Sequence, residues 1–272
     1  MIFLVTGCSR GLGLEFVRQL LTRGERVIAT CRSPAEATEL SALVAAAEPS
    51  GSTLLALDVS EEASIAKFPA LLDEASIAAI DVLVHNAGVS APTHPVDPVA
   101  TATGSALRRC FEVNAVGPLL LTQALLPRLR AGRGRKVLVV SSIMGSIQNT
   151  KAGGSVSYRT SKAAVNMIGK CLAGEHGIGT DDELAITLCH PGWCDTDSAL
   201  VHIEPSEPSP CRYHRRHCLS RCVVCSGLRR QPQPACQARG LRRRHAGRDR
   251  RDGGSLKSRL CGLHRNSSRV VS

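Results

Sequence analysis

The chain opens with IFLVTGCSRGLG, residues 2–13, and the expected fold follows from this segment. Ile2 to Val5 is a short apolar run, typical of a buried strand. It leads directly into a glycine loop with the spacing G-x-x-x-G-x-G, and a helical pattern continues through Leu21. This order predicts a dinucleotide site, because glycines permit a tight turn and the close approach of a pyrophosphate to the helix N-terminus.

Apolar runs of strand length alternate with helical patterns along the rest of the chain as far as residue 189. Strands are expected at residues 2–5, 26–31, 53–57, 81–84, 136–140 and 184–189. Helices are expected after the glycine loop and at residues 34–47, 61–72, 104–130 and 157–174. The alternation predicts an α/β fold, a doubly wound parallel sheet of Rossmann type with right-handed crossovers.

The end of the second strand indicates which dinucleotide binds. Residues 30–33 are Thr-Cys-Arg-Ser, with no acid where an NAD enzyme usually places one for the ribose hydroxyl groups. Arg10 and Arg32 are expected to flank a 2′-phosphate, because guanidinium groups match phosphate oxygens. This favours NADP (NADPH); the alternative is that both arginines are solvated loop residues.

Polar or glycine-containing segments follow the remaining strands. They are Asp58-Val59, His85-Asn86-Ala87-Gly88, Ser141-Ser142 and His190-Pro191-Gly192. Ligands of such sheets lie beyond the carboxyl ends of the strands, so these segments are expected to meet at one edge. Asp58 has two interpretations, a cap for the next helix or a contact to an adenine ring.

The helix expected at residues 157–174 carries Tyr158 and Lys162, which are four residues apart and share one face. An ammonium group beside a phenol favours the phenolate, so the pair can act as an acid or a base. The alternative is a surface tyrosine beside a solvated lysine. Asn114, within the expected helix at residues 104–130, either satisfies a backbone group or holds a water on a proton path.

Charge is distributed unevenly along the chain. Residues 1–198 carry a net charge of −2 and residues 199–272 one of +13, which together give the +11 of the whole chain. The first part therefore has no basic excess that would indicate nucleic acid or membrane as a partner. The six cysteines before Ser198 are scattered without paired spacing, as expected of buried free thiols in a reducing compartment. The chain shows no signal-peptide pattern and no apolar run of membrane-spanning length, so a cytoplasmic protein is expected.

The segment 199–272 is rich in arginine, cysteine and proline and poor in large apolar residues, so disorder is expected there. A nucleic-acid-binding arm would explain the arginines but lacks interleaved aromatic residues. A zinc site would need a second pair of ligands. Its candidates are His214, His217, Cys218, Cys222 and Cys225. The favoured hypothesis is an altered reading frame or a retained intron, and the transcript sequence would test it.

Taken together, residues 1–197 resemble the short-chain dehydrogenase/reductase family. The resemblance rests on the Thr6–Gly13 loop, Asp58-Val59, Asn86-Ala87-Gly88, Asn114, Ser141-Ser142, Tyr158-x-x-x-Lys162 and Pro191-Gly192. The glycine loop, residues 145–148 and residues 158–162 are similar to the sniffer or C-factor type of carbonyl reductase. The predicted domains are thus a catalytic domain at residues 1–198, incomplete at its C-terminus, and the tail at residues 199–272.

This resemblance implies roles for individual residues. Tyr158 would exchange a proton with the substrate oxygen, and Lys162 would lower the pKa of that phenol and bind the nicotinamide ribose. Ser142 would bind the substrate oxygen, and Asn114 would anchor a proton-relay water. The implied NADP-binding residues are Gly7, Ser9, Arg10, Gly11, Leu12, Gly13, Arg32, Asp58, Val59, Asn86, Ala87, Gly88, Tyr158, Lys162, Pro191 and Gly192. No metal is implied.

Two departures from the family pattern stand out. His85 replaces an asparagine that the family more often has, a change expected to be tolerated. After Asp197, the substrate-covering segment and the further strand that the family would have are not visible in the sequence. The expected function is NADPH-dependent reduction of a small carbonyl substrate or the reverse oxidation. The alternatives are a catalytically impaired dinucleotide-binding remnant and, less favoured, a nucleic-acid-binding protein. A homodimer through the helices at residues 102–130 and 157–174 is left open.

Overall fold

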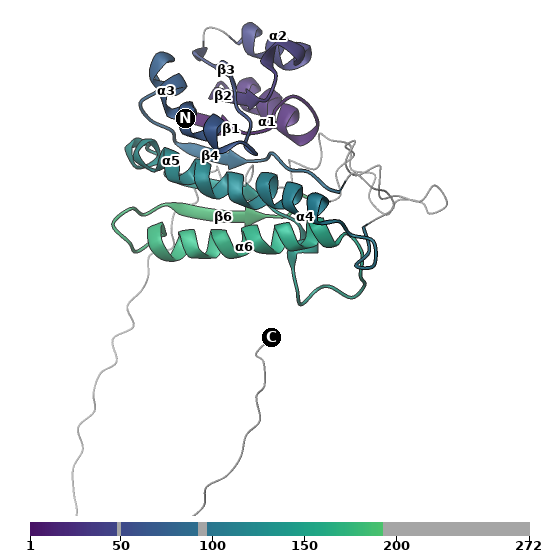
Figure 1. Cartoon of the computed structure of the whole chain (residues 1–272). Coiled ribbons are helices and arrows are strands. Elements are labelled where there is room, and N and C mark those ends of the chain that lie inside the picture. The colour runs from purple at the N-terminus through teal and green to yellow at the C-terminus, as the bar shows by residue number, and fades with distance from the viewer. Residues whose placement is uncertain (48–49, 92–96, 193–272) are drawn as a thin grey trace, which may run out of the picture. The chain divides into compact units, whose positions relative to one another are not determined.

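The computed structural model describes residues 1–47, 50–91 and 97–192. Within these residues, six parallel strands form one sheet with the order β3-β2-β1-β4-β5-β6 (Figure 1). The strands are β1 (Ile2–Val5), β2 (Arg26–Cys31), β3 (Thr53–Ala56), β4 (Val82–His85), β5 (Lys136–Val140) and β6 (Ala185–Cys189). This is the doubly wound order, and it confirms the Rossmann-type sheet. The chain reverses direction across the sheet between β1 and β4, where such folds bind their ligands.

Helices cover both faces of this sheet. They are α1 (Gly11–Thr22), α2 (Thr38–Ala46), α3 (Glu62–Glu74), α4 (Gly104–Phe111), α5 (Gly117–Ala131) and α6 (Val156–His176). Strand β1 shows why two layers form: Phe3 and Val5 pack in the core shared with α1 and α2, whereas Leu4 points into the core with α3, α5 and α6. Successive side chains of a strand point to opposite faces, and both sets are apolar here, so both faces are covered.

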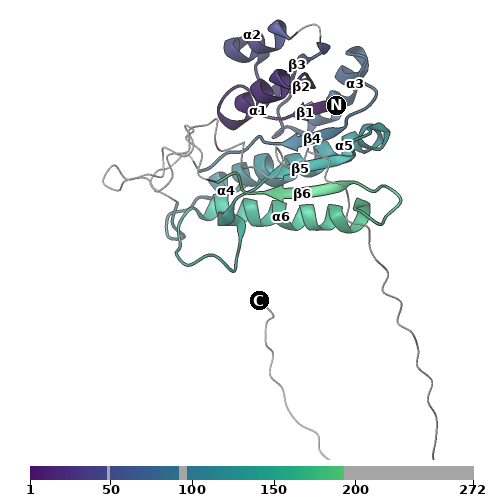
Figure 2. The ribbon, with the colours of Figure 1, turned by 180° about the vertical axis from the view of Figure 1, so that it is seen from behind.

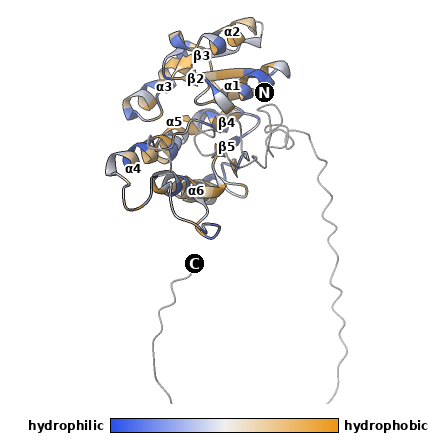
Figure 3. Cartoon of the chain, turned by 90° about the vertical axis from the view of Figure 1, so that its right-hand side faces the viewer, coloured by the Kyte–Doolittle hydropathy of each residue, from blue (hydrophilic) through white to orange (hydrophobic). Residues whose placement is uncertain are grey.

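Two opposed views show β6 and α6 lying side by side (Figures 1 and 2). Within the described residues, β6 pairs only with β5 and forms one edge of the sheet. The helices carry hydrophobic and hydrophilic residues around the coil, as expected for helices with one face against a sheet (Figure 3).

The helix expected at residues 104–130 is divided into three parts. Between α4 and α5, residues Glu112–Val116 form a π-helical turn, η3. Pro118 follows it in the first turn of α5. Proline has no N–H group, and its ring clashes with the carbonyl four residues earlier, here that of Asn114. The wider turn at η3 therefore coincides with the place where a regular helix would be obstructed.

A smaller difference concerns residues 34–47, which divide into a 3-10 turn, η1 (Pro34–Glu36), and α2. Among the cysteines, Cys8, Cys31, Cys110 and Cys189 are buried as expected, but Cys171 is exposed, contrary to the prediction. The described residues end at residue 192. They therefore do not include Cys194, the tail with its zinc candidates, or the region where the family would have a further strand and a substrate-covering segment. In the part of the chain that the structure describes, no helix has the length and apolar character to cross a membrane.

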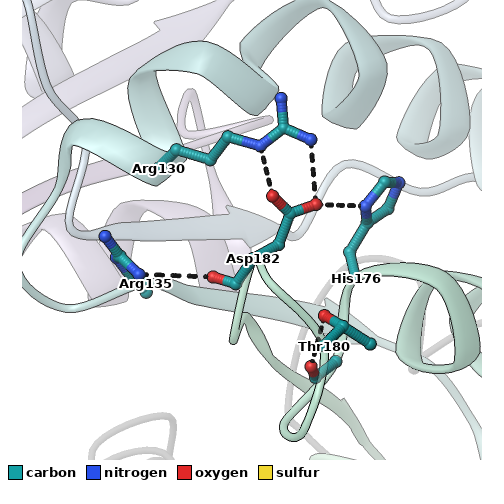
Figure 4. A network of polar contacts seen from close by, with 6 residues as sticks. Arg130, Arg135, His176, Thr180 and Asp182 are labelled. Carbon is teal, nitrogen blue, oxygen red and sulfur yellow. Dashed lines mark hydrogen bonds and ion pairs between the residues drawn. The ribbon is translucent and has the colours of Figure 1, made fainter.

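A polar network fastens the ends of α5 and α6 to the turn before β6 (Figure 4). Arg130 donates two hydrogen bonds to the Asp182 carboxylate, from Nε at 2.6 Å and from Nη2 at 2.8 Å. His176 Nδ1 lies 2.5 Å from the same carboxylate. These contacts lower the pKa of Asp182 to about 2, chiefly through the Arg130 hydrogen bonds.

Candidate active site

A cavity of about 390 Å³ lies beyond the carboxyl ends of the strands. All but two of the residues proposed from the sequence line it. They are Gly7, Ser9, Arg10, Gly11, Leu12, Arg32, Asp58, Val59, Asn86, Ala87, Gly88, Ser142, Tyr158, Lys162, Pro191 and Gly192. The two exceptions are Gly13, which packs against Gly7 and Asn86 of the lining, and Asn114, which hydrogen-bonds to Val89 of the lining. The structure thus brings segments from all parts of the sheet to one edge.

The glycine loop is packed so closely that larger residues would not fit. Gly7 has a φ of +70°, in the left-handed region that favours glycine. A Cβ atom on Gly13 would lie 2.1 Å from the carbonyl oxygen of Gly7 and 2.5 Å from Nδ2 of Asn86. Gly13 therefore serves the contact between α1 and the loop, as the third glycine of a dinucleotide fingerprint does.

Asn86 fastens this loop to the end of β4. Its Nδ2 donates to the carbonyl oxygens of Thr6 at 2.9 Å and Gly7 at 3.0 Å. Thr6 Oγ1 in turn accepts from the amides of Asn86 and Ala87, both at 3.1 Å. These bonds fix the shape of the floor of the cavity.

The N-terminus of α1 opens on the cavity. Arg10 is its N-cap residue, has an extended backbone and makes no side-chain capping hydrogen bond to the helix. Gly11 and Leu12 of the first turn line the cavity, as does Arg32 from the segment after β2. A helix N-terminus carries a partial positive charge and N–H donors, so this end of the cavity fits an anionic phosphate group.

Asp58 does not cap a helix. Its Oδ1 accepts from the amide of Ser60 at 2.9 Å and from Ser60 Oγ at 2.6 Å, whereas α3 begins after Glu61 without a side-chain cap. The capping interpretation is wrong because the carboxylate accepts from Ser60, in the turn before α3, and not from an amide of the helix. The carboxylate instead shapes a turn on the cavity wall.

Tyr158 and Lys162 lie one turn apart on α6, with Lys162 Nζ 5.7 Å from the centroid of the Tyr158 ring. Lys162 is only 4% exposed, and its Nζ donates to the main-chain oxygen of Val140 at 2.8 Å. Burial lowers the pKa of this lysine to about 8. The alternative of a solvated lysine on the surface is therefore wrong.

Asn114 is buried in η3, and its side-chain amide hydrogen-bonds to other groups of the protein. Oδ1 accepts from the amide of Val89 at 2.8 Å. Nδ2 donates to the oxygen of Val89 at 2.8 Å and to Ser161 Oγ at 2.9 Å. The expectation that this asparagine satisfies backbone groups is confirmed. It joins the segment after β4 to α6.

Ser142 follows β5 and begins the short 3-10 turn η4 (Ile143–Gly145). Its Oγ accepts from the amide of Met144 at 3.2 Å, which leaves the hydroxyl hydrogen to point elsewhere. Ser141 is more deeply buried, and its Oγ donates to Oδ1 of Asn166 at 2.6 Å. Of the two serines, Ser142 is thus the better placed to donate to a ligand.

His85 occupies a buried position at the end of β4. Its Nε2 lies 2.8 Å from Thr122 Oγ1, and this hydroxyl donates to the oxygen of Pro118 at 2.7 Å. The Thr122 oxygen is therefore the acceptor for Nε2–H. Burial lowers the pKa of His85 to about 3, so the ring is neutral and joins β4 to α5.

Several lining residues were not proposed from the sequence. They are Cys31, Leu57, Ser60, Val89, Ser90, Arg109, Glu112, Val113, Val140, Ser141, Ile143, Met144 and His190. Ser141 and His190 belong to segments that were expected at this edge without a role of their own, and most of the others adjoin a proposed residue. Arg109, Glu112 and Val113 come from α4 and η3, whose place beside the cavity depends on packing against α6.

The comparisons with known proteins agree with this geometry. A family model described as short chain dehydrogenase matches residues 1–203. A curated relative, the 1-hydroxy-2-glutathionyl-2-methyl-3-butene dehydrogenase of Rhodococcus sp. (strain AD45), is 36% identical over 194 residues, which are 71% of this chain and 78% of the relative.

Solved structures give the same result. An NADPH-bound carbonyl reductase from chicken fatty liver is 29% identical with a TM-score of 0.68, and the match covers 80% of this chain and 87% of the other. The carbonyl reductase Sniffer of D. melanogaster is 28% identical with a TM-score of 0.61, covering 73% and 82%. The expected resemblance to the sniffer type is confirmed.

Proposed function

The chain belongs to the short-chain dehydrogenase family, and on this premise we propose that it transfers a hydride between NADPH and a small carbonyl or alcohol substrate. The observation that carries the proposal is the position of Tyr158 and Lys162. The pair lines the same cavity as Ser142 and the glycine loop. The NADPH-bound carbonyl reductase with a similar fold supports the cofactor and the reaction class.

The cofactor assignment rests on charge and shape. We assign the 2′-phosphate to Arg10 and Arg32 and the pyrophosphate to the N-terminus of α1, where positive charge and N–H donors line the cavity. Asp58, Val59 and the segment 86–88 would line the adenosine side, and Pro191 and Gly192 the nicotinamide side. Bound NADPH supplies the hydride in this reaction.

Residues of the chain itself would transfer the proton that the substrate oxygen receives. Tyr158 would donate its phenolic proton to the substrate oxygen, while Ser142 Oγ holds that oxygen in place. Lys162 is mostly protonated at neutral pH, given its pKa of about 8, and its charge favours the phenolate form of Tyr158. Bringing a phenol from a pKa of about 10 to near neutrality requires a preference of about 4 kcal/mol for the phenolate.

For Asn114 we assign the proton-relay role to its main-chain carbonyl rather than to its side chain. The amide is bonded to Val89 and Ser161. Pro118, four residues further on, has no N–H group to donate to that carbonyl. A water on the carbonyl would lead a proton from solvent towards Lys162 and Tyr158 after each reduction, and away from them in the oxidative direction.

We assign catalysis to residues 1–198, with residues 199–272 as a separate basic segment. Purified full-length protein would test the function by NADPH fluorescence and by NADPH consumption with a panel of aldehydes and ketones. Binding together with turnover is expected. Binding without turnover would support an impaired remnant, and salt-sensitive DNA retention with neither would support nucleic-acid binding.

A further inference from the structure

The N-terminus of α6 is held by a residue from a distant part of the chain. Ser155, its N-cap residue, has a left-handed backbone with φ 48° and ψ 40°, and its side chain makes no capping hydrogen bond. Asp97 supplies the acceptors instead. Its main-chain oxygen accepts from the amide of Val156 at 3.1 Å, and its Oδ2 accepts from the amide of Ser157 at 3.0 Å.

This contact is buried and charged. Asp97 is 4% exposed and Ser157 is fully buried. Ser157 Oγ also donates to Asp97 Oδ2, so one carboxylate oxygen receives both donors of the same residue. A carboxylate at a helix N-terminus interacts favourably with the partial positive charge there, and burial strengthens the interaction.

Tyr158 is the next residue along the helix, and a second contact holds its other side. Ser161 Oγ donates to the main-chain oxygen of Tyr158 at 2.8 Å and accepts from Asn114 Nδ2. The backbone of Tyr158 thus lies between an Asp97 contact on its N-terminal side and an Asn114 contact on its C-terminal side.

We propose that Asp97 is a positioning residue for Tyr158, an inference that rests on the reductase function proposed above. The phenolic oxygen is far from the helix axis, so a small rotation of the first turn moves it away from the substrate oxygen. A misplacement of about 1 Å can lower a rate about 100-fold. The carboxylate of Asp97 prevents that rotation by fixing both polar groups of Ser157.

Three variants test the proposal, because a positioning role should lower kcat and leave the affinity for NADPH unchanged. In Asp97→Ala, kcat for carbonyl reduction is expected to fall about tenfold or more, with the Kd for NADPH within about twofold of the wild type. Asp97→Asn keeps an oxygen that can accept both hydrogen bonds, so most of kcat should return. Thr103→Ala is the matched control: Thr103 Oγ1 caps a different helix, α4, through the amide of Ala106 at 3.2 Å.

The control should lose thermal stability while it keeps kcat within about twofold. An Asp97→Ala variant with wild-type kcat, or one whose NADPH affinity falls as much as its kcat, would overturn the proposal. So would an equal loss of kcat in Thr103→Ala. If Asp97→Ala folds poorly by circular dichroism, Ser157→Ala removes one of the two hydrogen bonds; an unchanged kcat in that variant would also overturn it.

A measurement without turnover separates this inference from the function itself. The chain has two tyrosines, so fluorotyrosine labelling in a Tyr213→Phe background gives one fluorine NMR resonance, that of Tyr158. The resonance should be displaced or broadened in Asp97→Ala and keep its wild-type position in Thr103→Ala. An unmoved resonance overturns the positioning role. A wild-type protein that reduces no carbonyl compound overturns the reductase function, and the resonance still decides the role of Asp97.

Discussion

The ammonium group of Lys162 donates a hydrogen bond to the main-chain oxygen of Val140 at 2.8 Å. This bond joins the middle of the first half of α6 to the last residue of β5, directly before Ser141 and Ser142. It therefore fixes the distance between the helix that carries Tyr158 and the strand end that carries Ser142. The proposed acid and the proposed substrate-binding hydroxyl are held by one buried contact.

Replacing the tyrosine should separate chemistry from binding. Tyr158→Phe removes only the phenolic oxygen, so carbonyl reduction should fall about 100- to 10,000-fold, the usual contribution of a positioned acid. The Kd for NADPH, measured by fluorescence, should change less than about threefold because the ring remains. Turnover at the wild-type rate would remove Tyr158 from the mechanism.

The pH dependence of reduction should report on Lys162. Burial lowers the pKa of this lysine to about 8, so its ammonium form predominates below that pH and is lost above it. The kcat for carbonyl reduction is expected to decline as pH rises through about 8. Tyr158 becomes a phenolate when it donates its proton, and the neighbouring charge that stabilises this phenolate is then lost. Lys162→Met should give a low rate that lacks this transition. A wild-type profile that stays level well above pH 8 would contradict the assignment.

Cofactor selectivity should depend on the arginine after β2. Arg32→Ala should weaken NADPH binding about 10- to 100-fold, the loss expected for a charged hydrogen bond to phosphate, while NADH binding changes little. Arg23→Ala, at the far end of α1, is the control, and both affinities should match those of the wild type. Equal loss of both cofactors in Arg32→Ala would argue against a 2′-phosphate site.

The close contact at Gly13 predicts a steric effect. In Gly13→Ala the new Cβ atom would meet the Gly7 oxygen at 2.1 Å, so the loop must shift. We expect lower thermal stability and loss of NADPH binding. Gly174→Ala in α6 is the control: nothing lies within 4 Å of its Cβ position, and the helix should gain up to about 1 kcal/mol of stability. Unimpaired NADPH binding by Gly13→Ala would contradict the assignment of the glycine loop as the NADPH site.

The Asp182 network should contribute a stability that depends on pH. The pKa of this aspartate is lowered to about 2, chiefly by the hydrogen bonds of Arg130 and also by His176. Its contribution should be fully present above the unfolded-state pKa of about 4 and should be lost as pH falls through about 2. Asp182→Asn should therefore unfold at lower urea concentration than the wild type at pH 6, with a difference that shrinks below pH 4. Asp181→Asn, an exposed neighbour, should show no such difference.

The strand and helix pattern was predictable because each element carries its own signal. Phe3, Leu4 and Val5 are all apolar, which indicates a strand buried on both faces, and the glycine spacing after it indicates a dinucleotide loop. The division of residues 104–131 was not foreseen, although Pro118 was visible, because the effect of a proline near a helix start depends on how the preceding turn is packed.

Local sequence was thus enough to identify the Rossmann-type sheet, the family and most of the cavity lining, because periodicity and short motifs need no long-range information. The contacts between distant residues required the folded chain. Burial lowers the pKa of Lys162. The side-chain amide of Asn114 hydrogen-bonds to Val89 and Ser161, and Asp97 accepts a hydrogen bond from Ser157 although the two residues are far apart in the sequence. Such contacts arise only when α4, η3 and α6 pack together, since no spacing along the chain encodes which buried polar groups will become neighbours. The strand and glycine loop of residues 2–13 indicated where a cofactor would bind, and the packing around α6 determined how Tyr158 is held beside it.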